Sequence, residues 1–191
     1  MNINTDQLAQ QCVEAINGKI KNLKKLNIII VGKTGVGKST LINSVFRGNL
    51  TETGLGRPVT SEMRKIEKSN FPLAVYDTPG FELAQGQQNK VKDEILATIK
   101  KGVSKNDINE AIHCIWYCIN VGANRTFDET EVEWLRDFTE SNQVAQVPII
   151  VVLTQDCPKK KAAEMKNLVE KENLDIVKVV PVVAQDVDFE E

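Results

Sequence analysis

The sequence predicts an α/β fold with three layers, in which a mostly parallel six-stranded sheet with one antiparallel edge strand lies between helices. Short apolar runs alternate with longer amphipathic segments, which is the pattern of parallel strands joined by covering helices. The polar pair Ser69-Asn70 separates two of the runs closely enough for a hairpin, and hence for one antiparallel pair. A glycine-rich segment joins the first apolar run to the next amphipathic segment.

An extra helix is predicted before the sheet. Within residues 5–24, apolar side chains recur every four positions from Leu8 to Ile20, as on one face of a helix. We therefore divide the chain into an N-terminal amphipathic helix at 1–25 and one globular domain at 26–191.

The domain alternates strands and helices almost regularly. Nearly all side chains in residues 111–121 and 148–154 are apolar, as expected of strands covered on both faces. The predicted strands cover residues 26–31, 62–68, 71–76, 111–121, 148–154 and 176–183. The predicted helices cover residues 38–47, 88–101, 128–140 and 159–172.

Glycines and helix-capping residues mark several predicted helix ends. Gly48 stands where a helix-terminating glycine belongs, and Gly102 is expected to stop the helix at 88–101. Asp128 and Glu131, three positions apart, are predicted to form a capping box.

Composition excludes several classes of protein. Hydrophobic residues make up 41% of the chain, charged residues make up 26%, and the net charge is -2, so we expect a globular protein with no electrostatic signal for nucleic acid. No apolar run is long enough to span a bilayer. The N-terminus lacks the basic start and apolar run of a secretory signal, and the four cysteines form no CxxC pair. We expect a cytoplasmic protein with reduced thiols.

The glycine-rich segment at residues 32–39, GKTGVGKS, has the form GxxxxGKS between a strand and a helix. Glycines let backbone N–H groups surround phosphate oxygens, and the following helix directs its positive end at the same anion. The motif predicts a P-loop NTPase fold, with Lys38 reaching the β- and γ-phosphates and the Ser39 hydroxyl binding Mg²⁺. The predicted phosphate-binding residues are Gly32, Thr34, Gly35, Val36, Gly37, Lys38, Ser39 and Thr40.

A second motif, DxxG, follows the predicted strand 71–76. Asp77 is expected to hold Mg²⁺ through a water, and the Gly80 N–H to bond the γ-phosphate, so that loss of this phosphate releases the loop. Thr60, just before the strand that pairs with the DxxG strand, is the predicted threonine ligand of the metal. Lys38, Thr60 and Gly80 are thus the predicted catalytic residues, and Ser39, Thr60 and Asp77 the metal ligands.

These motifs resemble those of one group of proteins. The segment GKTGVGKSTLINSVF is similar to the P-loop of septin-like and immunity-associated GTPases, and residues 26–185 resemble the G domain of Era-like and septin-related GTPases. The resemblance implies a six-stranded sheet, GTP or GDP as ligand, Mg²⁺ as cofactor, and a switch driven by GTP hydrolysis to GDP and phosphate.

The resemblance also implies a base-recognition loop, [NT]KxD, after the fifth strand. The matching residues are Thr154, Gln155, Asp156 and Cys157. The lysine is replaced by Gln155 and the aspartate by Cys157, while Asp156 can serve if the loop is one residue shorter. Ala184 and Gln185 match the family's second base loop, in which the backbone N–H of Ala184 would meet the guanine carbonyl. A site without its carboxylate should discriminate less between bases.

Two departures from the family concern hydrolysis. Phe81 follows the DxxG motif where Ras-like proteins place a glutamine that orients the attacking water, and Gly35 stands where potassium-activated relatives carry asparagine. We therefore expect slow intrinsic turnover. Septin-like relatives pair across the nucleotide, which makes a homodimer through the nucleotide face a hypothesis. Arg125, in a loop after a strand, is either an arginine finger or a solvated residue.

Two alternatives to a switch GTPase stay open: a nucleotide-dependent dimerisation or scaffold module with little turnover, and an ATP-binding P-loop protein. The acidic residues 185–191 have little apolar character, so the closing C-terminal helix of a G domain is expected to be missing or replaced by the helix at 5–24. Membrane association would have to use that N-terminal helix or a missing C-terminal region.

Overall fold

The computed structural model describes residues 23–48, 50, 62–80, 85–122, 127–142, 146–154 and 159–182, together with Gly18 and Lys21. Its strands form one six-stranded sheet in the order β2-β3-β1-β4-β5-β6. The pair β2–β3 is antiparallel and all other neighbours are parallel, which confirms the predicted sheet. The strands are β1 Leu26–Val31, β2 Arg64–Glu67, β3 Leu73–Asp77, β4 Cys114–Asn120, β5 Ile149–Thr154 and β6 Lys178–Pro181.

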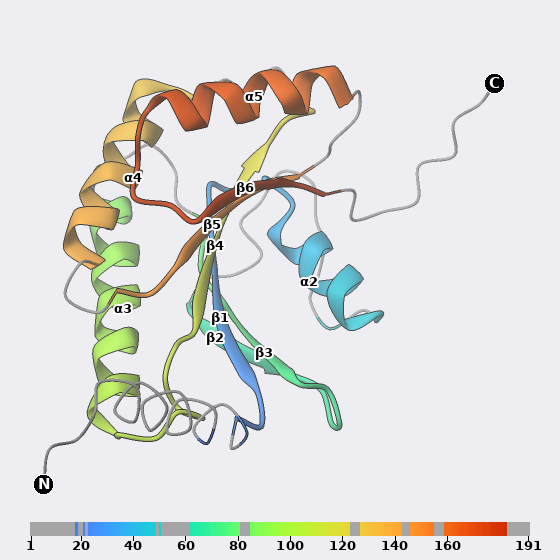
Figure 1. The fold of residues 1–191 in the computed structure, drawn as a ribbon, viewed down its shortest axis with the longest axis vertical. Coiled ribbons are helices and arrows are strands. Elements are labelled where there is room, and N and C mark those ends of the chain that lie inside the picture. Colours follow the sequence, from blue (N-terminus) through green and yellow to red (C-terminus); the bar gives the residue numbers. More distant parts are fainter. Residues whose placement is uncertain are drawn as a thin grey trace, which may run out of the picture.

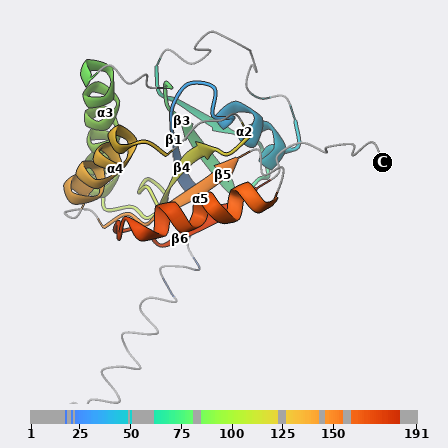
Figure 2. The ribbon, with the colours of Figure 1, turned by 90° about the horizontal axis from the view of Figure 1, so that it is seen from above.

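Helices cover both faces of this sheet (Figures 1 and 2). Helices α3, α4 and α5 pack on one face of the sheet and share one apolar cluster with it. Helix α2 packs on the other face through a second apolar cluster. Side chains of β4 alternate between the two clusters: Ile115 and Tyr117 belong to the first and Cys118 to the second. The helices are α2 Lys38–Phe46, α3 Gln85–Ser104, α4 Glu129–Asn142 and α5 Lys159–Lys171.

Two predicted helix ends are wrong. Gly102 lies inside α3, which continues to Ser104. A Cβ on Gly102 would lie 2.6 Å from the Glu110 carbonyl oxygen, so this glycine allows the chain before β4 to approach the helix. At the end of α2, the left-handed residue is Arg47 (φ 50°) rather than Gly48. The Arg47 and Gly48 N–H groups bond the Ser44 and Asn43 carbonyls, which forms a Schellman motif.

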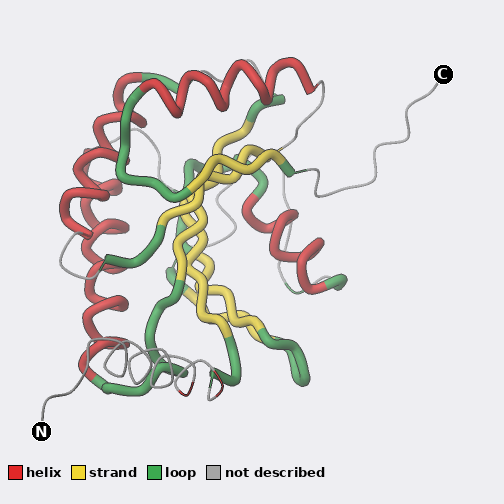
Figure 3. Tube along the Cα trace, viewed as in Figure 1, coloured by secondary structure: helices red, strands yellow, loops and turns green. Residues whose placement is uncertain are grey.

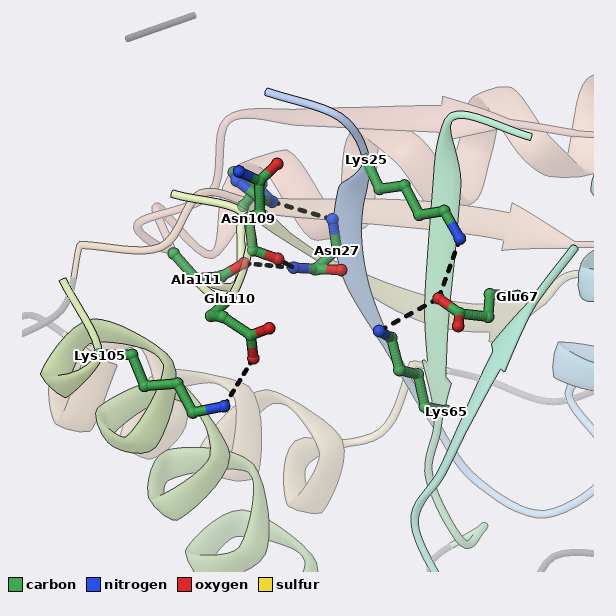
Figure 4. Close-up of polar contacts among 9 residues, drawn as sticks. Lys25, Asn27, Lys65, Glu67, Lys105, Asn109, Glu110 and Ala111 are labelled. Carbon is green, nitrogen blue, oxygen red and sulfur yellow. Dashed lines mark hydrogen bonds and ion pairs between the residues drawn. The ribbon is translucent and has the colours of Figure 1, made fainter. Parts of the chain in front are cut away.

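Strand β4 begins three residues later than predicted, at Cys114. The side-chain amide of Asn27 donates to the carbonyls of Asn109 (2.7 Å) and Ala111 (2.9 Å), as Figure 4 shows. The Asn27 N–H in turn donates to Nδ1 of His113 at 2.9 Å. These bonds hold the segment before β4 in a turn at the amino end of the sheet.

Several predictions fall outside the described residues. Of the helix predicted at 5–24, the structure describes Gly18 and Lys21, which are helical, and Leu23 and Lys24, which are not, so the predicted end at 24 is wrong. The C-terminal segment beyond 182, and with it the expected absence of a closing helix, also lies outside them. Figure 3 colours the described helices red and the described strands yellow.

Candidate nucleotide-binding site

The glycine-rich loop joins β1 to α2 at the carboxyl edge of the sheet, where β1, β3, β4 and β5 all end. Gly32, Gly35 and Gly37 have φ values of 148°, 75° and 92°, which other residues rarely adopt. A Cβ on Gly32 would also lie 2.6 Å from the Cys118 carbonyl oxygen. The loop therefore requires the glycines that the motif supplies.

Gly37 is also the N-cap of α2, and no side chain caps this end among the described residues. The first-turn N–H groups of a helix bind anions well because the helix dipole adds to their own. Ser39 and Thr40 lie in this first turn, at the positions predicted from the motif.

Lys38 begins α2, and its side chain is turned into the loop. Nζ donates to the carbonyls of Gly32 (2.8 Å) and Lys33 (3.2 Å), and only 8% of the residue is exposed. Burial lowers the pKa of Lys38, while the negative charge of Asp77 opposes this shift. A buried ammonium of this kind suits a bound anion, which would supply the missing counter-charge.

Two polar side chains at strand ends hold the loop from behind. The hydroxyl of Thr154, the last residue of β5, donates its one proton in a short hydrogen bond to the Val36 carbonyl, and the Ile119 carbonyl lies 3.2 Å from the same oxygen. The amide of Asn120, the last residue of β4, donates to the Gly35 carbonyl at 3.5 Å. The structure thus places Thr154, predicted to bind the base, against the phosphate loop.

The sequence analysis missed Asn120 as a site residue. Its side chain is buried, and its Oδ1 also accepts the Gly122 N–H at 2.8 Å. The available signal was a polar residue that ends an otherwise apolar strand at the edge where the phosphate loop lies.

The DxxG segment lies directly against the phosphate loop. Asp77 ends β3 opposite Ile30 of β1 and is fully buried, with one carboxylate oxygen 3.6 Å from the Arg64 guanidinium. A Cβ on Gly80 would lie 2.5 Å from Oγ1 and 2.9 Å from the backbone N of Thr34. The two motifs predicted to share the γ-phosphate are therefore in contact.

The donor set fits a magnesium ion. Ser39 supplies a hydroxyl and Asp77 a carboxylate, both oxygen donors of the kind Mg²⁺ prefers. They lie on α2 and at the end of β3, next to the glycine-rich loop. Within the described residues, no group of three or more His, Cys, Asp or Glu side chains could hold a metal ion.

The remaining predicted site residues lie outside the part of the chain that the structure describes: Thr60, Gln155, Asp156, Ala184 and Gln185. Phe81, Arg125 and Cys157 lie outside it as well. Among the described helices, none combines the length and apolar character needed to cross a membrane.

Fold and phosphate loop together define a P-loop GTP-binding domain. The chain belongs to the AIG1 family, which its residues 26–186 match. This confirms the predicted relationship to immunity-associated and septin-related GTPases.

This chain matches only a part of each of the longer curated relatives described next. Translocase of chloroplast 90 of Arabidopsis thaliana is 38% identical over 82 residues, which cover 42% of this chain and 10% of the relative. Cell division control protein 10 of Candida albicans is 27% identical over 183 residues, with 82% of this chain and 49% of the relative covered. The chain thus spans less than half the length of these two relatives.

Solved structures of similar fold contain nucleotides. Arabidopsis thaliana Toc33 in complex with GDP and Mg²⁺ has a TM-score of 0.57 at 19% identity, covering 92% of this chain and 78% of Toc33. Aquifex aeolicus Era bound to GDP and aluminium fluoride has a TM-score of 0.58 at 21% identity, covering 84% of this chain and 52% of Era. At these identities the likeness supports the fold.

Proposed function

We propose that this chain binds GTP and GDP with Mg²⁺, hydrolyses GTP slowly, and switches state with the bound nucleotide. The observation that supports this most directly is the contact of Gly80 with Thr34, which brings the DxxG segment to the glycine-rich loop. Membership of the AIG1 family and the GTP-binding relatives support the choice of nucleotide.

Each predicted residue has a role in this proposal. Lys38 neutralises the β- and γ-phosphates, and Ser39, Asp77 and Thr60 hold the magnesium ion, which stabilises the charge that develops on the phosphates. The Gly80 N–H bonds the γ-phosphate. Because Gly80 lies against Thr34 of the glycine-rich loop, a γ-phosphate in that loop would hold the DxxG segment, and its loss would release it.

Guanine selectivity is proposed for the base loop at Gln155 and Asp156, together with Ala184 and Gln185. Cys157 replaces the aspartate of the family pattern, so we propose Asp156 as the carboxylate that pairs with guanine. If instead no carboxylate faces the base, the protein binds ATP and GTP alike.

A second candidate function is a nucleotide-dependent dimerisation module with little turnover. Dimerization is described as important for the GTPase activity of the chloroplast translocon components Toc33 and Toc159, and Phe81 gives this chain no side chain to orient water at its position. We propose pairing through the nucleotide face, with Arg125 reaching the partner's nucleotide.

We also propose a cytoplasmic location, to which the free thiols of Cys114 and Cys118 are suited.

Calorimetric titration of the chain with GTP, GDP and ATP, each with Mg²⁺, tests the proposal. Binding of GTP and GDP but not ATP is expected, and a Lys38→Ala variant should lose it. Equal binding of ATP would refute guanine selectivity, and no binding of any nucleotide would refute the proposed function. Phosphate release measured at low and high protein concentration separates the candidates: turnover per chain that rises with concentration indicates an active dimer.

A further inference from the structure

Lys33, the second residue of the glycine-rich loop, is anchored to helix α4. Its Nζ lies 2.9 Å from Oδ2 of Asp128 and 3.0 Å from Oε2 of Glu131. The Lys33 side chain is 15% exposed and that of Glu131 is 4% exposed. This ion pair is therefore much less screened by solvent than the surface pairs of the molecule.

The acidic end of the contact is itself held in place. Oδ1 of Asp128 accepts the Glu131 N–H at 2.9 Å, which is one half of the predicted capping box. The Glu131 carboxylate, which would complete the box, binds Lys33 and accepts the hydroxyl of Tyr117 at 3.2 Å. Tyr117 is fully buried in β4, so the network joins the loop, the central strand and α4.

Burial and charge oppose each other in the network: burial raises the pKa of the Glu131 carboxyl, and the charge of Lys33 opposes that shift. Burial disfavours the charged form of Lys33, but hydrogen bonds and charges from Asp128 and Glu131 outweigh it and raise the pKa of Lys33. Burial, with the nearby charge of Glu131, raises the pKa of Tyr117 well above its usual value, so its hydroxyl keeps the proton that it donates.

We propose that Asp128 and Glu131 are positioning residues that hold Lys33 and thereby keep the glycine-rich loop in its nucleotide-binding shape. The inference rests on the proposed nucleotide binding and assigns the second residue of the motif an anchoring role. The Lys33 carbonyl accepts the Lys38 ammonium at 3.2 Å, so displacement of Lys33 also disturbs the lysine that meets the phosphates. A loop fixed before binding loses less conformational entropy when the nucleotide binds.

The opposite role for Lys33, direct contact with a phosphate, makes a different prediction. Glu131→Gln keeps the lysine charge and removes the buried one of the two carboxylates that hold the side chain. If Lys33 acted on the phosphate itself, this variant would bind nucleotide as well as the wild type or more tightly. If Lys33 acts as an anchor, Glu131→Gln and Lys33→Met weaken binding alike.

The experiment is a titration of Mg·GDP into the wild type, Lys33→Met, Glu131→Gln and the double variant, with the melting temperature of each nucleotide-free protein measured in parallel. Each single variant should bind about tenfold more weakly, and the double variant no more weakly than either, because residues of one contact are not additive. Lys33→Arg should restore affinity to within about threefold, since guanidinium also bridges carboxylates.

Two further variants complete the design. Asp128→Asn tests the more exposed end of the network, where the side chain is 37% exposed, and should weaken GDP binding even if Glu131→Gln folds poorly. Lys25→Met is the matched control: Lys25 pairs with Glu67 at 3.1 Å on the surface at the amino end of the sheet (Figure 4), and its loss should leave GDP binding unchanged.

The outcomes separate this inference from the proposed function. A wild type that does not bind Mg·GDP overturns both. A wild type that binds, with Glu131→Gln and Asp128→Asn unchanged in affinity, overturns the positioning role alone. Lower melting temperatures with unchanged dissociation constants overturn it as well, because the network would then only stabilise the fold.

Discussion

Replacement of Thr154 by valine removes one hydroxyl and nearly preserves the side-chain shape. The hydroxyl donates to the Val36 carbonyl, with the Ile119 carbonyl 3.2 Å away, and Thr154 is only 2% exposed. A buried acceptor left without its donor costs about 1–3 kcal/mol. For a domain of this size, a loss of about 2 kcal/mol lowers the melting temperature by roughly 4–8 °C.

The same substitution distinguishes two roles of Thr154 in nucleotide binding. If Thr154 holds the phosphate loop, Thr154→Val weakens GDP and inosine diphosphate equally, because both share the diphosphate. If its side chain contacts the base, the ratio of the two affinities changes, since inosine lacks the guanine amino group. We expect both dissociation constants to rise by about threefold to tenfold, in line with about 1 kcal/mol per hydrogen bond.

The assay is calorimetric titration of both nucleotides with Mg²⁺, accompanied by thermal unfolding. Thr139→Val is the matched control, because the Thr139 hydroxyl is also buried but donates to the Arg136 carbonyl within α4, at 2.8 Å. That variant should leave both affinities unchanged. A GDP to inosine diphosphate ratio that shifts by more than about threefold in Thr154→Val would refute the reasoning, as would an unchanged melting temperature.

Three other predictions concern close approaches and burial. Gly80→Ala forces a Cβ to within 2.5 Å of Thr34 Oγ1; GDP binding should persist while GTP turnover falls more than about tenfold, since the γ-phosphate contact is lost, and normal phosphate release would contradict this. Gly102→Ala should lower the melting temperature although alanine favours helices, because its Cβ would lie 2.6 Å from the Glu110 carbonyl oxygen; a higher melting temperature would show that the helix and the turn separate easily. Burial raises the pKa of the Cys118 thiol to about 12, so at pH 8 iodoacetamide should modify it far more slowly in the folded than in the unfolded chain; equal rates by mass spectrometry would place the thiol at the surface.

Patterns within a few residues predicted the fold well. The strand at 26–31 and the helix beginning at Lys38 have the predicted limits because apolar runs and a glycine-rich turn act locally. The strand predicted at 111–121 begins late, since the carbonyl of its first residue, Ala111, accepts a hydrogen bond from the Asn27 side chain, 84 positions away in sequence. A local hydrophobic pattern cannot predict a hydrogen bond between a side chain and a backbone carbonyl that are so far apart in sequence.

In the candidate site, too, residues of short motifs could be predicted from the sequence, whereas contacts between distant segments could not. Lys38, Ser39 and Asp77 could be predicted because each belongs to a short motif whose spacing follows from its chemistry. The anchor between Lys33 and Glu131 could not, because it depends on where the first turn of α4 lies relative to the loop. Asp128 and Glu131 do have capping spacing, but the buried Lys33 and Tyr117 compete successfully for the Glu131 carboxylate.

The strand ends determine how the loop can present its N–H groups. In a planar trans peptide the carbonyl and the following N–H point in opposite directions. Because Thr154 and Asn120 bond the Val36 and Gly35 carbonyls from the sheet side, the N–H group of Gly37 is directed away from that side, while the Val36 N–H donates to the Lys33 carbonyl at 3.4 Å. Loss of either donor would let a peptide unit rotate without removing any group that touches the base. If the proposed nucleotide binding holds, we therefore expect the sheet edge to contribute to phosphate affinity and not to base selectivity.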